Sequence, residues 1–226
     1  MYRMTRTQGN RKFLWIAAIF FLLAFGMVAV YKWVGFSGLD EAGFAFASSL
    51  RFDLLTTGLT VLTHLGDTKS VITLVAILLL WLFLKGYRKE IVIVAVIILA
   101  DTMMNELMKN LFARERPIGL NLITKPDSYS FPSGHAMISS VYFLIVAYLF
   151  RTLGEHTWWR FLTPLFYVLI LLIVSSRVYL GVHFASDVLT GLFFAFGWYF
   201  LFRYADDKWV RRRQTSYPRW TPSTRY

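Results

Sequence analysis

Six long apolar stretches constrain this chain more than any other feature. They are Phe13–Val34, Ser70–Leu84, Ile91–Phe112, Ala136–Phe150, Phe161–Val182 and Val188–Phe202. A helix needs roughly 20 mostly apolar residues to cross a bilayer, and the shorter stretches reach that length by tilting or by including their polar flanks. The first stretch is too long for the core of a signal peptide and lacks a small-residue cleavage site, so we interpret it as retained. The sequence therefore predicts an all-α fold, a bundle of six transmembrane helices in one domain over residues 1–226.

The composition agrees with a membrane protein and excludes several other classes. Of the 226 residues, 57% are hydrophobic and 16% are charged, whereas a typical soluble domain has about 25% charged residues. A chain this apolar is not intrinsically disordered. The absence of cysteine excludes a disulfide scaffold and any cysteine-ligated metal centre. The formal net charge of +11 is more typical of anchoring at the cytoplasmic membrane surface than of nucleic-acid binding, so we expect no nucleic-acid partner.

The basic residues predict how the bundle is oriented. Sixteen of the 24 lie on the side that holds both termini and the loops after the second and fourth apolar stretches. The positive-inside rule places that side in the cytoplasm. Residues 205–226 would then form a basic cytoplasmic tail, and residues 35–66 a short extracytoplasmic helical insertion between the first two spans. Some basic residues of the opposite side cluster near helix ends and need another reason: Lys109, Arg114, Arg116, Lys125 and Arg177.

The first candidate group lies where the third span ends. Ionisable residues at span ends are costly and therefore suggest function. Lys109 and Arg116 are two helical turns apart and share a face if the helix continues to Pro117, which we expect to end it. Two cations on one face suit a dianionic group. Basic side chains that merely extend from a helix end to the membrane surface are an equally good explanation of this pair alone.

The second group, Phe131–His135, directly precedes the fourth span. Ser133 is a candidate N-cap, and Gly134 leaves backbone N–H groups open to a ligand, as an anion site at a helix N-terminus requires. His135 stands in the first turn, where it could donate a proton. For an isolated Ser-Gly-His, an ordinary cap with an incidental histidine is the better explanation.

The third group follows the fifth span. His183 and Asp187 are four residues apart and face each other on a helix or tight turn. A carboxylate on one imidazole nitrogen fixes the tautomer and leaves the other nitrogen free as a nucleophile or base. Arg177 can bind an oxyanion through two hydrogen bonds. The alternative for this group alone is a structural ion pair between helices.

Taken together, the three groups predict one site on one membrane face. Three cations and backbone donors would bind a tetrahedral oxyanion, with one histidine placed to attack and the other to protonate. This is the equipment for phosphoryl transfer through a phosphohistidine, in which positioning and charge stabilisation provide most of the catalysis. We expect no cofactor and no metal, because no acidic cage for magnesium is evident.

The motifs resemble the three-part signature of the type 2 phosphatidic acid phosphatase superfamily. All eleven signature positions are present in order, as Lys109-x6-Arg116-Pro117, Pro132-Ser133-Gly134-His135 and Ser176-Arg177-x5-His183-x3-Asp187. The resemblance implies a metal-independent lipid phosphatase of the bacterial cell membrane. It also implies that His183 attacks phosphorus, that Asp187 orients His183 and that His135 protonates the leaving alkoxide. The phosphate would be bound by Lys109, Arg116, Ser133, Gly134 and Arg177.

The substrate and the alternatives stay open at this stage. We favour phosphatidylglycerophosphate, with undecaprenyl pyrophosphate and phosphatidic acid as alternatives, and we expect a monomer. An anion transporter would show paired broken spans in two halves with charges at mid-membrane. Here the charges lie at helix ends on one side, and no internal repeat is evident. A vanadate-dependent haloperoxidase shares the oxyanion signature but is soluble, which six apolar spans contradict.

Several polar residues near the motifs have weaker interpretations. Asp101 and Asn105 share a helix face and favour structural hydrogen bonds, and Glu106 is placed to pair with Lys109. Asp67 and Lys69 could line a substrate entrance, although a solvated loop is the better explanation. No partner is evident for two further histidines, His64 and His156.

Overall fold

The computed structural model describes residues 8–154 and 158–216, and within these ranges it contains helices and no strand. The elements are α1 (Gln8–Trp33), α2 (Ser37–Ser49), α3 (Asp53–Thr63), η1 (His64–Gly66), α4 (Thr68–Leu84), α5 (Arg88–Phe112), η2 (His135–Ser139), α6 (Ser140–Leu153), α7 (Trp159–Tyr179) and α8 (Ala185–Ser216). The all-α prediction is confirmed. His156 falls outside the described residues.

Five helices are each long and apolar enough to cross a membrane. They are α1, α5, η2 joined with α6, α7 and α8. The second predicted span, Ser70–Leu84, corresponds to α4, which has 17 residues and passes the same test only together with α3, from which it is bent by 55°. The protein is therefore a multi-pass membrane protein with five spans, or six if the bent pair counts as one.

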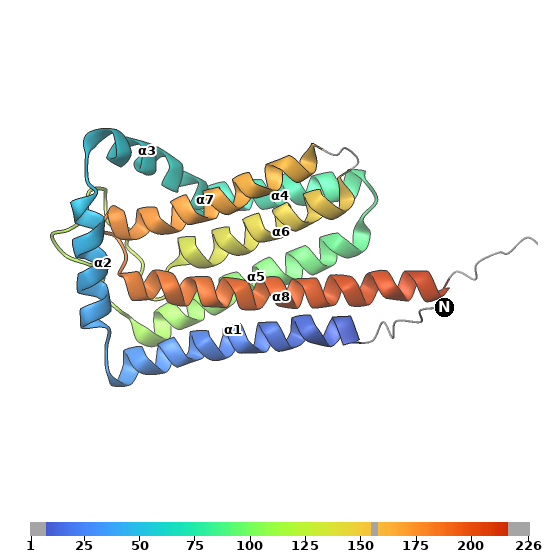
Figure 1. The fold of residues 1–226 in the computed structure, drawn as a ribbon, viewed down its shortest axis with the longest axis horizontal. Helices are drawn as coiled ribbons and strands as arrows, with labels where there is room; N and C mark the ends of the chain where they lie inside the picture. Colours follow the sequence, from blue (N-terminus) through green and yellow to red (C-terminus); the bar gives the residue numbers. More distant parts are fainter. Residues whose placement is uncertain (1–7, 155–157, 217–226) are drawn as a thin grey trace, which may run out of the picture.

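Helix α6 forms the centre of the bundle, surrounded by the other long helices (Figure 1). Its residues from Ser140 to Ala147 are all buried, because its sequence is apolar on every side and a helix of that kind belongs inside a bundle. The outer helices expose large apolar side chains such as Leu22, Phe83 and Leu99. Such a surface is suited to lipid rather than to water.

Helices α1 and α8 pack along each other through aromatic side chains. Phe20 stacks on Phe200 with ring centroids 5.8 Å apart, and Phe21 meets the edge of Trp198 at 5.2 Å. A β-carbon added at Gly197 would lie 3.0 Å from the Phe21 ring. A glycine at this position therefore allows the close approach of the two helices.

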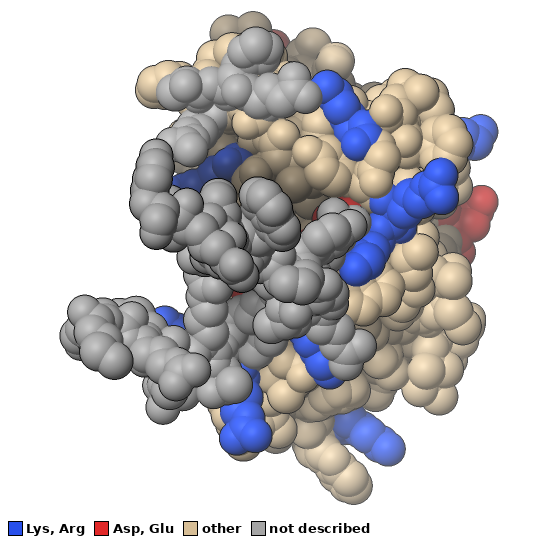
Figure 2. Space-filling view, turned by 90° about the vertical axis from the view of Figure 1, so that its right-hand side faces the viewer, with Lys and Arg blue, Asp and Glu red and all other residues tan. Residues whose placement is uncertain are grey.

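Both described ends of the chain lie at the same end of the bundle (Figure 1). Figure 2 looks onto that end and shows many lysine and arginine side chains around its rim and few acidic ones. The start of α1 and the α4–α5 connection contribute basic residues there, including Lys12, Arg88 and Lys89. The opposite end is crossed by α2 and holds the connections between α5 and η2 and between α7 and α8 (Figure 1). Among the described residues, the basic side chains that the sequence assigns to opposite sides thus lie toward opposite ends of the bundle.

Residues 35–66, predicted as a helical insertion between the first two spans, contain α2, α3 and η1, of which α3 and η1 also belong to the bent pair with α4. One helix end differs from prediction. Helix α8 continues through Ser216, so residues 205–216 of the expected tail are helical, and 217–226 lie outside the described residues. Helix α5 ends at Phe112, as the third apolar stretch predicted, and does not continue toward Pro117, because Ala113 adopts a left-handed conformation (φ 44°). This cap directs the chain away from the helix axis.

Candidate active site

Six of the eight predicted site residues line one cavity of about 910 Å³, while Ser133 and Asp187 are buried and do not line it. Lys109 comes from α5, Arg116 from the loop after α5, Arg177 from α7, and His183 from the turn before α8. Gly134 and His135 also line the cavity. Lys109 and Arg116 therefore meet as predicted, although the loop and not a continuous helix brings Arg116 there.

His183 is held by polar partners on both ring nitrogens. Arg116 Nη1 lies 2.9 Å from Nε2, while Nδ1 faces Ser130 Oγ at 3.3 Å and Asp187 Oδ2 at 3.4 Å. A guanidinium group can only donate, so Nε2 accepts. Geometry therefore assigns the imidazole proton to Nδ1, next to the carboxylate, and leaves the lone pair of Nε2 toward the cavity cations.

The environment of His183 keeps it neutral. Its side chain is 1% exposed, and burial lowers the pKa of the imidazole well below its usual range, helped by the nearby Arg116 and Arg177. Burial disfavours the charged form, and neighbouring cations disfavour it further. A neutral imidazole with an available lone pair is the form that can act as a nucleophile.

Asp187 belongs to a larger buried network that the sequence did not indicate. Arg114 Nη1 lies 2.5 Å from Asp187 Oδ1, and Arg114 Nη2 lies 2.6 Å from Asp40 Oδ2. Ser130 Oγ donates to Asp187 Oδ2 over 2.5 Å, and Ser186 donates its backbone N–H to Asp40. Arg114 thus bridges two buried carboxylates and links α2 to the start of α8. The clustering of Arg114 with other cations was visible in the sequence, but its acidic partners were not.

Arg116 is fixed by carbonyl groups of two loops. Its Nε donates to the Ser128 carbonyl over 2.7 Å, and Nη1 donates to the Val182 carbonyl over 2.8 Å. Burial lowers the pKa of Arg116 to about 10, so the group remains charged at neutral pH. The guanidinium therefore offers a fixed positive charge beside Nε2 of His183.

Arg177 is almost fully buried and is anchored through one of its terminal nitrogens. Its Nη1 donates to Thr63 Oγ1 over 2.7 Å, and Ser176 also binds this hydroxyl over 3.0 Å. Among the described residues, Nε of Arg177 has no hydrogen-bond partner. Because a buried unpaired donor is costly, Arg177 is suited to an anion that enters the cavity. Thr63 of α3 is a further site residue that the sequence did not indicate.

The loop before η2 brings backbone donors to the cations. Ala136 N donates weakly to Ser133 Oγ over 3.4 Å, which agrees with the predicted cap. A β-carbon at Gly134 would lie 3.1 Å from Asn105 Oδ1 and 3.7 Å from Lys109 Nζ. Glycine at this position therefore lets α5 and its lysine approach the backbone. The first turn is a π-helix, a rare form that occurs frequently at functional sites.

The polar residues of α5 have mainly structural partners. Asn105 donates to the Pro132 carbonyl over 3.2 Å and so holds the loop before η2. Glu106 lies 3.7 Å from Lys109, which confirms the expected pairing. Asp101 is fully buried, and its carboxylate oxygens have no hydrogen-bond partner among the described residues. Across residues 8–154 and 158–216, no group of three or more acidic or histidine side chains is arranged to hold a metal ion.

His135 has an acidic partner that we had assigned to a solvated loop. Its Nε2 lies 3.0 Å from Asp67 Oδ1, and the other oxygen of Asp67 lies 2.7 Å from Nδ1 of His64. The expectation that His64 lacks a partner is therefore wrong. The two residues lie 68 and 71 positions before His135, so no local spacing rule could have paired them with it.

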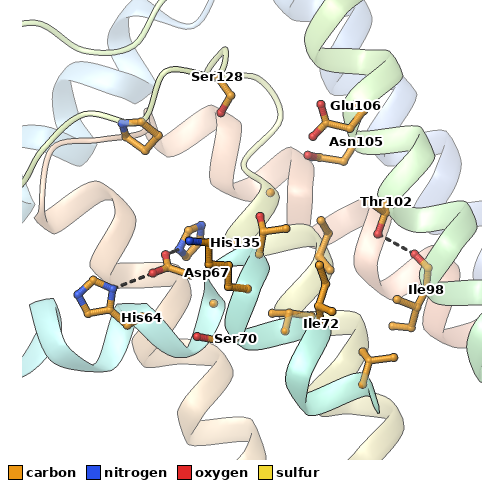
Figure 3. Close-up of a pocket in the computed structure, with 18 of the residues that line it drawn as sticks. His64, Asp67, Ser70, Ile72, Ile98, Thr102, Asn105, Glu106, Ser128 and His135 are labelled. Atoms are coloured by element: carbon orange, nitrogen blue, oxygen red, sulfur yellow. Dashed lines mark hydrogen bonds and ion pairs between the residues drawn. The ribbon is translucent and has the colours of Figure 1, made fainter. Parts of the chain in front are cut away.

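The cavity extends from the cations into an apolar part between α4 and α5. Ile72, Val75 and Leu79 line it from α4, and Ile98 and Thr102 line it from α5. Figure 3 shows Ile72, Ile98 and Thr102 on one side of this space and His135 and Asp67 on the other. A polar end lined by cations thus continues into an apolar part between two outer helices.

Comparison with known proteins identifies the family. The family model of the PAP2 superfamily matches residues 90–211. Phosphatidylglycerophosphatase B of Bacillus subtilis is 31% identical over 179 residues, which cover 77% of this chain and 87% of that protein. This chain therefore belongs to the PAP2 superfamily, and its relatives indicate a phosphatase.

Further comparisons agree. A putative undecaprenyl-diphosphatase of Escherichia coli is 34% identical over 131 residues, 55% of this chain and 62% of that protein. The crystal structure of a transmembrane PAP2-type phosphatidylglycerolphosphate phosphatase from Bacillus subtilis superposes with a TM-score of 0.72 at 26% identity, covering 92% of this chain and all of that one. Aquifex aeolicus LpxE, 23% identical, shares the fold with a TM-score of 0.60 over 74% of this chain and 95% of its own.

Proposed function

We propose that this protein is a metal-independent membrane lipid phosphatase that removes the terminal phosphate of phosphatidylglycerophosphate. One observation carries the proposal. Lys109, Arg116, Arg177 and His183 line the same cavity as the apolar side chains between α4 and α5. A phosphate group on an apolar tail fits both parts of such a cavity. The relative named phosphatidylglycerophosphatase B supports the choice of headgroup.

The reaction proceeds in two displacements at phosphorus. In the first, Nε2 of His183 bonds to phosphorus, the phosphorus–oxygen bond to the lipid breaks, and His135 gives its proton to the leaving alkoxide. In the second, water attacks phosphorus, the phosphorus–nitrogen bond breaks, and His135 takes the proton back. The cations, with Ser133 and the Gly134 amide, stabilise the phosphoryl oxygens throughout.

The hydrogen bond between Arg116 and Nε2 must be exchanged when substrate binds. A guanidinium donor on the nucleophilic lone pair can move by a small rotation to a phosphoryl oxygen, which frees Nε2 for attack. Arg116 thereby protects the nucleophile in the free enzyme and binds substrate in the complex. All the residues of this cycle belong to one chain, so we propose that a monomer is active.

A panel of purified substrates tests the headgroup. We expect phosphate release from phosphatidylglycerophosphate to have the highest kcat/KM, above undecaprenyl pyrophosphate and phosphatidic acid. A higher kcat/KM for undecaprenyl pyrophosphate would replace the headgroup assignment with the activity named for the Escherichia coli relative. Release from none of the three would reject the lipid phosphatase.

A matched pair of substitutions on α4 tests where the lipid tail lies. Ala76 lines the cavity, whereas its neighbour Ile77 does not and is 58% exposed on the outer surface. We expect Ala76→Trp to raise KM for a long-chain lipid at least about tenfold, because the indole fills space that a methylene chain would use. Hydrolysis of a short-chain phosphate ester should be unchanged, and Ile77→Trp should match the wild type with both. Equal effects of the two substitutions would reject the tail position.

We further propose that the site faces the extracytoplasmic side, with both termini in the cytoplasm. The support is the basic end of the bundle shown in Figure 2, to which the positive-inside rule applies. The cysteine-free chain allows single-cysteine labelling at Asp127→Cys, near the site, and at Thr152→Cys, at the end of α6. An impermeant thiol reagent on intact cells should label position 127 and not 152, and the reverse pattern would invert the orientation.

A further inference from the structure

We propose that Asp67 is a positioning residue for the general acid His135, holding its imidazolium form through Nε2 so that Nδ1 donates the proton to the leaving oxygen. The proposal rests on the function proposed above, because it assigns a partner to one step of that reaction. The site would then contain two carboxylate–imidazole pairs. One serves the nucleophile and the other serves the acid.

The contacts form a chain from the cavity to the surface. His135 Nε2 lies 3.0 Å from Asp67 Oδ1, and Asp67 Oδ2 lies 2.7 Å from His64 Nδ1. The exposed fraction of the side chains rises along this chain from 15% at His135 through 44% at Asp67 to 66% at His64. Figure 3 shows the imidazole of His135 beside the carboxylate of Asp67, and His64 on the other side of that carboxylate. Both oxygens of Asp67 are therefore engaged, which fixes the orientation of the carboxylate.

The backbone at the joint between η1 and α4 places Asp67 against His135. A β-carbon at Gly66 would lie 2.6 Å from Cδ2 of His135 and 3.0 Å from Ile173 Cγ2. The imidazole therefore packs directly on the backbone next to Asp67. The Asp67 carbonyl accepts the first hydrogen bond of α4, from Val71 N at 2.9 Å, so the carboxylate stands on a rigid corner of the bent helix pair.

Nearby cations disfavour protonation of His135, and the carboxylate of Asp67 opposes their effect. Arg177 of α7 and Arg116 of the loop after α5 both act on the imidazole as cations. Glu106, Lys109 and His183 line the same cavity. Asp67 is the carboxylate that contacts His135 directly. Because like charges disfavour protonation and a contacting carboxylate favours it, loss of Asp67 leaves the acid among cations.

The nitrogen assignment distinguishes the two histidines. Asp187 and Ser130 face Nδ1 of His183 and leave Nε2 for attack, whereas Asp67 faces Nε2 of His135. The proton that reaches the leaving oxygen must then come from Nδ1 of His135. This proton is returned to the same nitrogen by the water that hydrolyses the phosphohistidine, so the cycle needs no other proton source.

The isosteric substitution Asp67→Asn tests the proposal through leaving-group dependence. An alkyl leaving group needs protonation, whereas an aryl group such as p-nitrophenolate leaves without it. We expect kcat for the alkyl phosphate lipid to fall about 10- to 100-fold, a part of what general acid catalysis contributes, while kcat for an aryl phosphate changes less than about threefold. Asp53→Asn, which removes an exposed carboxylate of the neighbouring α3, should leave both rates unchanged.

A titration of His135 by NMR in ¹⁵N-histidine-labelled protein provides a readout that does not depend on turnover. We expect the pKa of His135 to be lower in Asp67→Asn than in the wild type, and the alkaline limb of kcat to move to lower pH with it. Equal losses with both leaving groups, or an unchanged titration, would overturn the proposal while the phosphatase stands. A wild-type enzyme inactive on every phosphate ester would instead reject the proposed function and this inference with it.

Discussion

Arg116 Nη1 lies 2.9 Å from Nε2 of His183, so the guanidinium and the proposed nucleophile share one hydrogen bond. The contact determines which nitrogen of His183 holds the proton. It also places a positive charge beside the nitrogen that would attack phosphorus. In the proposed reaction, a phosphoryl oxygen of the substrate takes the place of Nε2 as the acceptor of this hydrogen bond.

Replacement of the nucleophile should abolish turnover without unfolding the protein. We expect His183→Ala to lower kcat by more than about 10³-fold, because residual rates after loss of a nucleophile come only from binding and charge stabilisation. A phosphohistidine is hydrolysed in acid, so the intermediate is trapped from radiolabelled lipid and kept at alkaline pH. A labelled wild type and an unlabelled variant are expected, and normal turnover in the variant would reject the mechanism.

Loss of Arg114 should destabilise the fold. Arg114→Met leaves the carboxylates of Asp40 and Asp187, whose side chains are 6% and 0% exposed, without their shared cation. Removal of one partner from a buried ion pair costs about 3 kcal/mol or more. Unfolding by sodium dodecyl sulfate in mixed micelles measures the free energy. The cost should be smaller by about 1 kcal/mol in an Asp40→Asn background, and strictly additive costs would contradict the network.

The acid limb of the pH profile should lie below the pH at which an ordinary histidine titrates. Burial holds the pKa of His183 well below its usual range, and only the neutral form attacks. Lowering a histidine pKa extends the neutral form to lower pH, so the nucleophile should remain available below about pH 6.5. A phosphate monoester itself titrates near pH 6, so His183 is followed directly by NMR. The chain has four histidines, and His183→Ala assigns the signal. A transition at or above pH 6.5 would contradict the prediction.

Chelators should leave the rate unchanged. Lys109, Arg116 and Arg177 can supply the charge stabilisation that magnesium provides in other phosphoryl transfers. We expect the same kcat in excess EDTA and after dialysis against it. A rate that falls with EDTA and returns with magnesium would show that the three cations do not suffice.

The sequence predicted the parts of the site that are close together along the chain. His183 and Asp187 form the expected pair four residues apart, and Ser133 accepts the expected capping hydrogen bond. Local spacing carries this information because a turn of helix or a cap has a fixed geometry. The apolar stretches likewise predicted the long helices, since the bilayer sets their length.

The sequence could not predict partners that depend on packing between distant segments. Asp40 and Thr63 reach the site only because α2 and α3 fold back over the end of the bundle (Figure 1). The same packing turns Asp67 from an expected loop residue into a neighbour of His135. The end of α5 at Phe112 agrees with the predicted stretch, but the loop that brings Arg116 to the site was not predicted. A left-handed helix cap is usually a glycine, so Ala113 gives no signal for this turn.

The region by which this chain is matched to its family begins at residue 90, yet Asp40, Thr63 and Asp67 precede that residue. Thr63 and Asp67 contact the signature residues Arg177 and His135 directly. Asp40 is linked to the signature residue Asp187 through their shared partner Arg114. A polypeptide cut to the matched region would contain every signature residue and none of these supports. The structural unit that holds the proposed site is therefore larger than the matched segment. Transplanting the signature helices alone would transfer the signature residues without the contacts that orient them.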